Sequence, residues 1–138
     1  MLQQTTVGAV VPYYRRWLKK YPDIGTLARA PLSRILKDWQ GLGYYERARN
    51  LKAAARLIVS RHEGRIPETV AELVRLPGIG EYTAAAILSL ALDKPLPVLE
   101  ANVRRVMARL LRLRGPVNAA AERKIRSALA ALFPRRGA

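Results

Sequence analysis

Apolar residues recur at the spacing of an α-helix along most of this chain, and this regularity constrains the fold more than any other feature. Between residues 44 and 62, apolar side chains return every three or four positions, the pattern of one buried helix face. The same pattern is found over residues 69–76, 81–92, 102–113 and 119–133. No segment shows the alternation of apolar and polar residues that marks a half-buried strand. The sequence therefore predicts an all-α fold.

Proline and length refine this prediction. Pro12 lies inside the helical pattern of residues 5–21 and lacks a backbone N–H, so it predicts a kink or a break in that helix. Residues 95–99 are predicted to form an extended connector. Because 138 residues match the commonest size of one domain, we expect a single helical domain over residues 1–138, with a helical hairpin at 69–92.

The balance of charge favours a polyanionic partner. Lys and Arg number 25 against ten Asp and Glu, which gives a formal net charge of +15 at pH 7. Of the 25 basic residues, 19 are arginine, whose planar guanidinium suits phosphate. Nucleic acid is the simplest partner for such a chain. An arginine-rich genome and an anionic membrane surface are the alternative explanations.

Cysteine content and hydropathy exclude several classes of protein. The chain has no cysteine, which excludes disulfides, thiolate zinc sites and iron–sulfur ligation by its own residues. No apolar run approaches the roughly 20 residues of a membrane span. The first residues lack the basic and apolar regions of a signal peptide. We therefore expect no membrane partner and a cytoplasmic, nucleoid-associated location.

A Gly-x-Gly turn interrupts the helical pattern at Leu76-Pro77-Gly78-Ile79-Gly80, and a run of helix formers begins again at Glu81. Glycine lets another backbone approach closely, and the free N–H groups at a helix start attract an anion. Two helices around such a turn can therefore grip a nucleic-acid phosphate without reading sequence. The alternative is an ordinary helical hairpin whose glycine caps the first helix.

These residues are similar to a known family. Leu76–Leu88 resembles the helix–hairpin–helix of the base-excision DNA glycosylase superfamily, which includes endonuclease III. Met1–Thr5, Trp39–Leu51 and Pro97–Val106 resemble the MutY-type adenine DNA glycosylase branch, and together the motifs cover nearly all of the chain in order. The resemblance implies a six-helix-barrel glycosylase fold. It also implies a monomer that removes adenine mispaired with guanine or 8-oxoguanine from double-stranded DNA.

The resemblance further assigns DNA contacts. Such an enzyme must flip its target nucleotide out of the duplex, and a wedge can fill the gap that is left. Leu42 and Tyr44 would form this wedge, while Gln4 and Thr5 would contact the lesion on the opposite strand. The remaining expected DNA contacts are Gly78, Ile79, Gly80 and Arg104. The alternative for Leu42 and Tyr44 is that both are core residues beside a helix cap.

Catalysis of glycosidic cleavage needs an acid for the leaving base and a carboxylate for the sugar cation. The family's general-acid glutamate lies two residues before the position of Met1, and the chain begins at that methionine. The family's aspartate is replaced here by Glu100, with Asn102 two residues later as a further candidate. The alternative for Glu100 is a first-turn acid that interacts with a helix dipole. As it stands, the chain is expected to be a poor glycosylase.

Tyr82 occupies the position at which strand-cleaving relatives carry a lysine. A phenol cannot form the Schiff base of that route, so the residue predicts a monofunctional enzyme that leaves an abasic site. By resemblance, Tyr82 would lie close to the sugar as part of the catalytic group. The alternative is that its ring only packs beneath the hairpin.

The resemblance also bears on cofactors. Family members commonly continue into a four-cysteine cluster loop, for which this chain has no ligands, so no iron–sulfur cluster is expected in it. The hairpin carbonyls of Val74, Leu76 and Ile79 would coordinate a potassium or sodium ion, unless water satisfies them. Two other functions stay open: a non-catalytic DNA-binding module or degenerate fragment, and a basic helical interaction protein without a DNA role.

Overall fold

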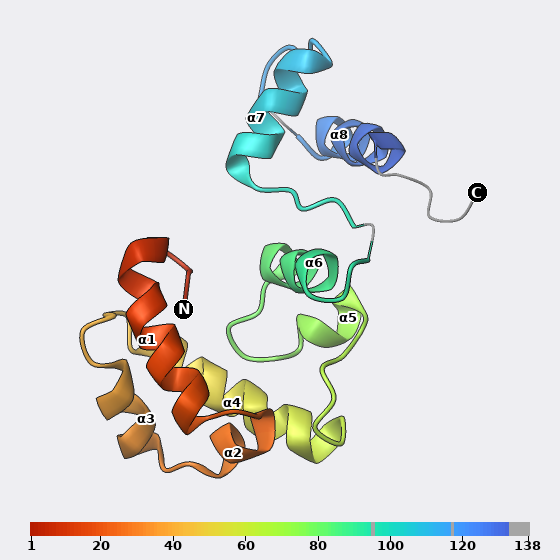
Figure 1. Cartoon of the computed structure of the whole chain (residues 1–138). Coiled ribbons are helices and arrows are strands. Elements are labelled where there is room, and N and C mark those ends of the chain that lie inside the picture. Colours follow the sequence, from red (N-terminus) through yellow and green to blue (C-terminus); the bar gives the residue numbers. More distant parts are fainter. Residues whose placement is uncertain (95, 117, 133–138) are drawn as a thin grey trace. The chain divides into compact units, whose positions relative to one another are not determined.

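A computed structural model describes residues 1–94, 96–116 and 118–132 of the chain. Within these ranges it contains eight helices and no strand, which confirms the all-α prediction (Figure 1). The helices are α1 (Val7–Lys20), α2 (Ile24–Arg29), α3 (Leu32–Trp39), α4 (Glu46–Arg61), α5 (Val70–Leu73), α6 (Glu81–Leu90), α7 (Ala101–Leu110) and α8 (Ala119–Leu132). None of them, over the part of the chain that is described, is long and apolar enough to cross a membrane.

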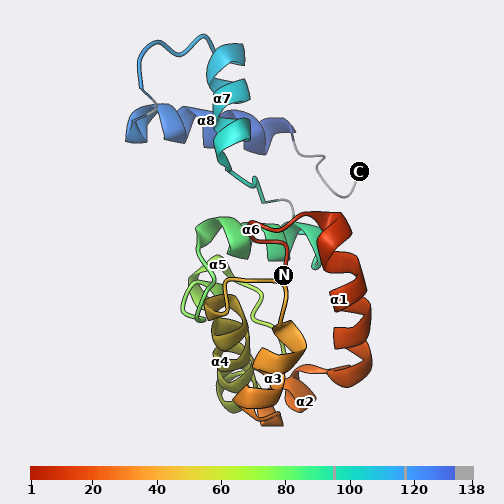
Figure 2. The ribbon, with the colours of Figure 1, turned by 90° about the vertical axis from the view of Figure 1, so that its left-hand side faces the viewer.

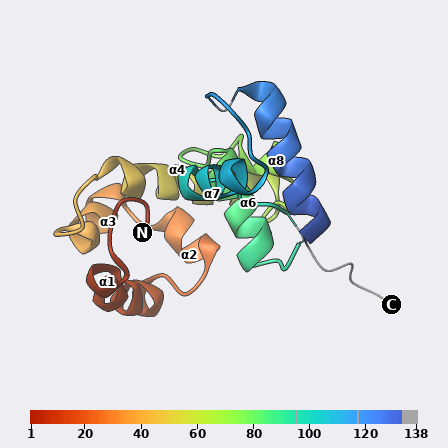
Figure 3. The ribbon, with the colours of Figure 1, turned by 90° about the horizontal axis from the view of Figure 1, so that it is seen from above.

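The chain divides into two compact units. Unit 1 comprises Met1–Pro67 and Arg75–Gly78, and unit 2 comprises Glu68–Val74 and Ile79–Ala138. Unit 1 thus holds α1 to α4, with α2 and α3 packed against α4 (Figure 2). Unit 2 holds α5 packed against α6, and α7 packed against α8, which runs in a different direction (Figure 3).

Aromatic residues form the centre of the unit 1 core. Trp39 and Ile35 of α3 are almost completely buried. The Trp17 ring of α1 lies 4.6 Å from the Tyr21 ring and 5.5 Å from the Trp39 ring, edge-on to the latter. Side chains of this size contribute most of the apolar area that a small core can bury. The core therefore fixes the helix that ends at Trp39 and the loop that follows it.

Pro12 was expected to kink or break its helix, and the structure excludes the break, since α1 runs through Pro12 continuously. The missing N–H of a proline leaves the carbonyl four residues earlier without its helical partner. Here that carbonyl belongs to Gly8, and both Gly8 and Pro12 are exposed. Water can therefore satisfy the carbonyl, and the core contacts of Val10 and Trp17 hold the helix on either side.

The predicted helix at 69–76 is much shorter in the structure. Helix α5 begins after Thr69, whose Oγ1 accepts a 3.3 Å hydrogen bond from the Glu72 N–H, and it ends at Leu73. The chain then turns through Pro77 and Gly78, and the latter has φ +75°, which cannot continue a right-handed helix. No bounds were predicted for α2 and α3, although Pro31 is typical of a helix start and is the N-cap of α3. Asp23 caps α2 through a 2.6 Å bond from the Thr26 N–H, a local signal that the apolar periodicity does not contain.

Unit 2 has a small core around Leu99, Met107 and Ile125. Residues 96–99 form neither helix nor strand, as expected of a connector, and residue 95 lies outside the described residues. Leu99 is buried in this core directly before α7. Its burial fixes the position of the next residue, Glu100, at the start of that helix.

Candidate functional site

The residues expected to form the wedge and to contact the lesion all lie in unit 1, and they differ in how far they are exposed. Tyr44 is 65% exposed, whereas Leu42 is 7% exposed and belongs to the unit 1 core. Gln4 is exposed and Thr5 is half-buried. The burial of Leu42 favours its alternative role as a core residue in the free protein. The exposure of Tyr44 suits an aromatic side chain that is offered to a partner.

Arg47 connects the segment of Thr5 to the loop of Tyr44. Its Nη1 donates to the carbonyl oxygens of Met1 (2.7 Å) and Gln3 and to Thr5 Oγ1 (3.0 Å). Its Nη2 donates to the carbonyl oxygens of Leu42 (2.9 Å) and Gly43 (3.3 Å). The sequence reading assigned no role to this arginine. Arg47 lies within the Trp39–Leu51 motif, but its partners in Met1–Thr5 are more than 40 residues away in sequence, so no sequence pattern predicts these contacts.

Glycine is needed at one position of the hairpin turn. A Cβ on Gly78 would lie 2.9 Å from the Asn50 Cβ, and the backbone there has φ +75°. Gly80, by contrast, is the N-cap of α6 with φ −92° and ψ 176°, and a Cβ would meet nothing within 4 Å. The free structure therefore gives no reason for glycine at position 80. Close approach of a partner to that backbone would give one.

Glu100 is the N-cap of α7, and its carboxylate is held in place. Oε1 accepts from the backbone N–H groups of Asn102 (3.0 Å) and Val103 (3.2 Å), and Oε2 accepts from Asn102 Nδ2 (3.3 Å). Asn102 Oδ1 in turn accepts from Arg105 Nη2. The carboxylate satisfies free donors of the helix end, and the same bonds give it a fixed position. Glu100 thus precedes the first turn, where the alternative interpretation had placed it, and serves as the N-cap.

Tyr82 and Arg104, two further candidate residues of unit 2, differ in whether their side chains are exposed or engaged in an ion pair. Tyr82, in the first turn of α6, is 53% exposed, so its ring is not packed away beneath the hairpin. Arg104 Nη2 pairs with Glu122 Oε1 at 3.1 Å, and Arg126 Nη2 reaches the same oxygen at 3.1 Å. Arg104 is therefore engaged within unit 2, and a phosphate would have to share it with Glu122.

Among the described residues, no group of three or more His, Cys, Asp or Glu side chains could hold a metal ion. The carbonyls of Val74, Leu76 and Ile79 are a different type of donor. Backbone oxygens suit hard monovalent cations. The coordination of potassium or sodium by these residues stays a proposal.

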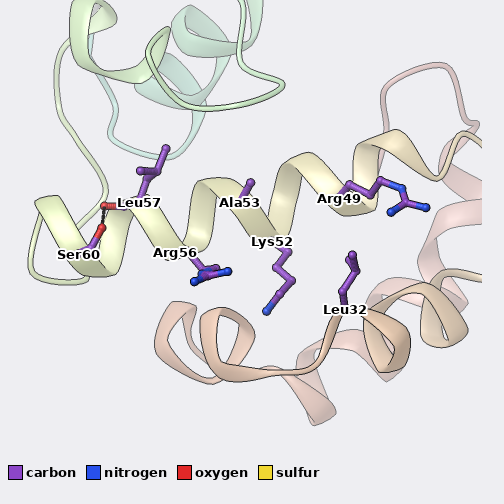
Figure 4. Close-up of a pocket in the computed structure, with 7 residues that line it drawn as sticks. All are labelled: Leu32, Arg49, Lys52, Ala53, Arg56, Leu57 and Ser60. Atoms are coloured by element: carbon purple, nitrogen blue, oxygen red, sulfur yellow. Dashed lines mark hydrogen bonds between the residues drawn. The ribbon is translucent and has the colours of Figure 1, made fainter.

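A basic groove lies elsewhere on unit 1. It has a volume of about 500 Å³ and is lined by Leu32, Arg49, Lys52, Ala53, Arg56, Leu57 and Ser60 (Figure 4). Lys52 Nζ donates to the carbonyl oxygens of Ala28 (3.2 Å) and Ala30 at the end of α2. One of the three basic side chains that line the groove is therefore used within the fold. None of the expected site residues lines this groove.

Comparison with known proteins identifies the family. The model of the HhH-GPD superfamily of base excision DNA repair proteins matches residues 1–134. The chain belongs to this superfamily, which confirms the resemblance and the helix–hairpin–helix fold. The chain is therefore a member of a superfamily of base-excision DNA repair proteins, and individual relatives within it have more specific names.

Several relatives with similar sequences are named adenine DNA glycosylase. One from Buchnera aphidicola subsp. Baizongia pistaciae is 46% identical over 109 residues, which cover 79% of this chain and 31% of the relative. One from Rattus norvegicus is 46% identical over 111 residues, which cover 80% of this chain and 22% of the relative. The chain thus spans only about a third or less of the length of either protein.

Solved structures show the same fold. A thermostable thymine-DNA glycosylase matches with a TM-score of 0.78 and 29% identity, over 96% of this chain and 62% of its own. A non-covalent endonuclease III–DNA complex matches with a TM-score of 0.77 and 26% identity, over 96% of this chain and 61% of its own. The first of these proteins is named for thymine and the relatives above are named for adenine, so the fold does not by itself select a base.

Proposed function

We propose that this chain is part of a monofunctional adenine DNA glycosylase. Its substrate is adenine mispaired with guanine or 8-oxoguanine in double-stranded DNA, and it hydrolyses the N-glycosidic bond. The observation that carries this proposal is the fixed carboxylate of Glu100 at the start of α7, in the segment that resembles the family's catalytic segment. The names of the 46% identical relatives support adenine as the base.

The role of Glu100 is electrostatic. Cleavage of the glycosidic bond builds positive charge on the sugar, and a carboxylate that is already oriented stabilises this charge without reorganising. The hydrogen bonds from Asn102 and Val103 orient Glu100 in this way. Protonation of the leaving adenine falls to the glutamate that the family places two residues before the position of Met1.

Recognition falls to unit 1. We assign the wedge to Tyr44, because it is exposed, and we assign Leu42 to the support of the loop, because it is buried. Gln4 and Thr5 contact the base opposite the flipped adenine. Tyr82 faces the sugar, and as a phenol it offers no amine for strand cleavage. The enzyme therefore leaves an intact strand with an abasic site.

The hairpin turn grips a phosphate through the backbone at Gly78, Ile79 and Gly80. The start of α6 supplies free N–H groups and the positive end of a helix dipole. A potassium or sodium ion on the carbonyls of Val74, Leu76 and Ile79 would complement this grip. Contact through backbone groups carries no sequence preference, which suits a repair protein that acts as a monomer on any flanking sequence.

The test is release of adenine from a duplex with adenine opposite 8-oxoguanine, by a chain that carries Glu-Val ahead of Met1. Since misplacing a catalytic group by about 1 Å can cost about two orders of magnitude in rate, Glu100→Asp should raise the rate by up to about 100-fold. Glu100→Gln should abolish it and retain DNA binding. No strand cleavage should appear before alkali treatment. Glu68→Gln removes an exposed unit 2 carboxylate as the control and should change nothing.

One observation favours a second candidate function, a DNA-binding module without catalysis. The Glu100 carboxylate is already used as a helix cap, a role that needs no catalysis. If the extended chain and its Glu100→Asp variant bind the mismatched duplex and never release adenine, this second function replaces the first.

A further inference from the structure

Three residues of unit 1 other than glycine have a left-handed backbone conformation, which such residues rarely adopt. One of them, Glu63, follows the end of α4, and the other two belong to the segments that Arg47 connects. Gln4 has φ 58° and Tyr44 has φ 47°. Such conformations are unfavourable and persist where the surroundings impose them, which is often at binding sites. Both residues are among those that the proposed function uses to read the lesion. The question is what imposes the conformation on each of them.

Arg47 contacts the peptide group immediately before each of these residues. One arm of its guanidinium donates to the Gln3 carbonyl, which belongs to the peptide that enters Gln4. The other arm donates to the Gly43 carbonyl, which belongs to the peptide that enters Tyr44. A hydrogen bond at that carbonyl restricts the rotation that would relax the left-handed backbone of the next residue.

The remaining contacts make this link rigid. The Arg47 Cζ lies 5.4 Å from the centre of the Tyr44 ring and 5.5 Å from that of Trp39. Trp39 is buried, and its Nε1 donates a 3.0 Å bond to the same Gly43 carbonyl. The link is thereby anchored to the unit 1 core. Among the described residues, none of the acceptors of Arg47 is a carboxylate, so these contacts do not neutralise its positive charge.

We infer that Arg47 is a positioning residue that clamps Met1–Thr5 to the loop of residues 41–45, so that Gln4 and Tyr44 are presented as one rigid reading element. The clamp needs the planar fork of arginine, because its two arms point at segments about forty residues apart in sequence. Lysine keeps the charge and offers no such fork. The role of Gln4 and Tyr44 in recognising the lesion rests on the proposed function. The clamp itself rests only on the contacts of Arg47.

The clamp is tested in the free 138-residue chain by hydrogen exchange with Arg47→Lys. Peptides that cover residues 1–6 and 41–45 should both exchange at least about tenfold faster in the variant, since local opening sets the rate. The body of α1 should be unchanged. Arg49→Lys is the matched control, because Arg49 lies on the same helix, is exposed, and takes no part in the contacts of the clamp. It should leave both peptides as in the parent.

The reading role is tested with two duplexes, one undamaged and one with adenine opposite 8-oxoguanine and 2-aminopurine beside the mismatch. Arg47→Lys should keep the affinity for undamaged duplex within about twofold, because its charge is retained. Its preference for the lesion should fall by about tenfold or more, and the 2-aminopurine signal of unstacking should fall with it. Arg49→Lys should keep the preference and the signal.

Three results would overturn the inference. The first is faster exchange in only one of the two segments, and the second is an unchanged lesion preference in Arg47→Lys. The third is loss of cooperative unfolding in that variant, which would make Arg47 a residue of the core. If the parent chain shows no lesion preference, the proposed function and the reading role fail together. The exchange experiment then still decides whether the clamp exists.

Discussion

At the scale of single residues, the turn at 76–80 contains one glycine that the fold needs and one that it does not. Gly78 has both a positive φ and a close neighbour in Asn50, and Gly80 has neither. Both stand in the same short motif, and the sequence offers no way to tell them apart. The distinction allows binding to be tested without disturbing the fold.

We predict that Gly80→Thr will weaken binding to all duplexes alike, by about tenfold, with little change in stability. Threonine caps a helix about as well as glycine, so α6 should keep its start, while the added side chain obstructs the approach of a phosphate. Fluorescence anisotropy with several duplexes, together with thermal unfolding, measures both effects. If the variant binds as tightly as the parent, the turn is not the phosphate grip.

Gly78→Ala is expected to act through the fold. An alanine at φ +75° should cost about 1–2 kcal/mol, and its Cβ must also displace Asn50. Gly78→Asn tolerates the left-handed backbone and keeps the clash, so its loss of stability should be smaller and not zero. Equal stability of the parent and Gly78→Ala would contradict the close approach of Asn50.

At the scale of elements, a polar contact joins the end of α1 to α3. The Tyr21 hydroxyl donates a 2.8 Å bond to Asp38 Oδ2, and Lys20 pairs with the same carboxylate. Burial, together with the bond to Asp38, raises the pKa of Tyr21 to about 12. Burial alone would favour the neutral form of Asp38, yet the bonds from Lys20 and Tyr21 lower its pKa below the usual 3.8.

The pH dependence of this contact follows from the signs of the two shifts. The raised pKa of Tyr21 contributes stability that is complete below about pH 10 and is lost as the pH rises through about 12. The lowered pKa of Asp38 contributes stability that is present above about pH 3.8 and is lost as the pH falls through its folded value.

We therefore predict that Tyr21→Phe will destabilise unit 1 near neutral pH and remove part of the alkaline loss. A hydrogen bond to a charged group contributes about 1.5–3 kcal/mol. Denaturant unfolding followed by tryptophan fluorescence reports on unit 1 alone, because both tryptophans of the chain, Trp17 and Trp39, lie in it. Tyr14→Phe, on the exposed side of α1, is the control. A difference between parent and Tyr21→Phe that stays constant from pH 7 to 12 would argue against the assigned pKa.

At the scale of the whole molecule, the net charge of +15 sets the response to salt. A protein that makes six to ten phosphate contacts loses about 10³–10⁵ in affinity between 50 and 200 mM salt, because counterions are released. We predict a steep linear log–log plot for this chain with duplex DNA, measured by anisotropy. A flat plot would contradict electrostatic binding. The same titration in a bulky organic cation, at equal ionic strength, tests the proposed potassium or sodium ion.

The sequence by itself determined the helical class, the place of the hairpin turn and the family, because periodicity and contiguous motifs are local properties. It did not determine that α1 continues through Pro12, that α5 is only Val70–Leu73, or that Leu42 is buried beside an exposed Tyr44. Those outcomes depend on which side chains share a core. The cap that Glu100 forms on α7 is local, because its partners Asn102 and Val103 lie two and three residues ahead. The contacts of Arg47 were decided by the tertiary structure, since hydrogen bonds between distant segments depend on distances in space that a sequence does not record.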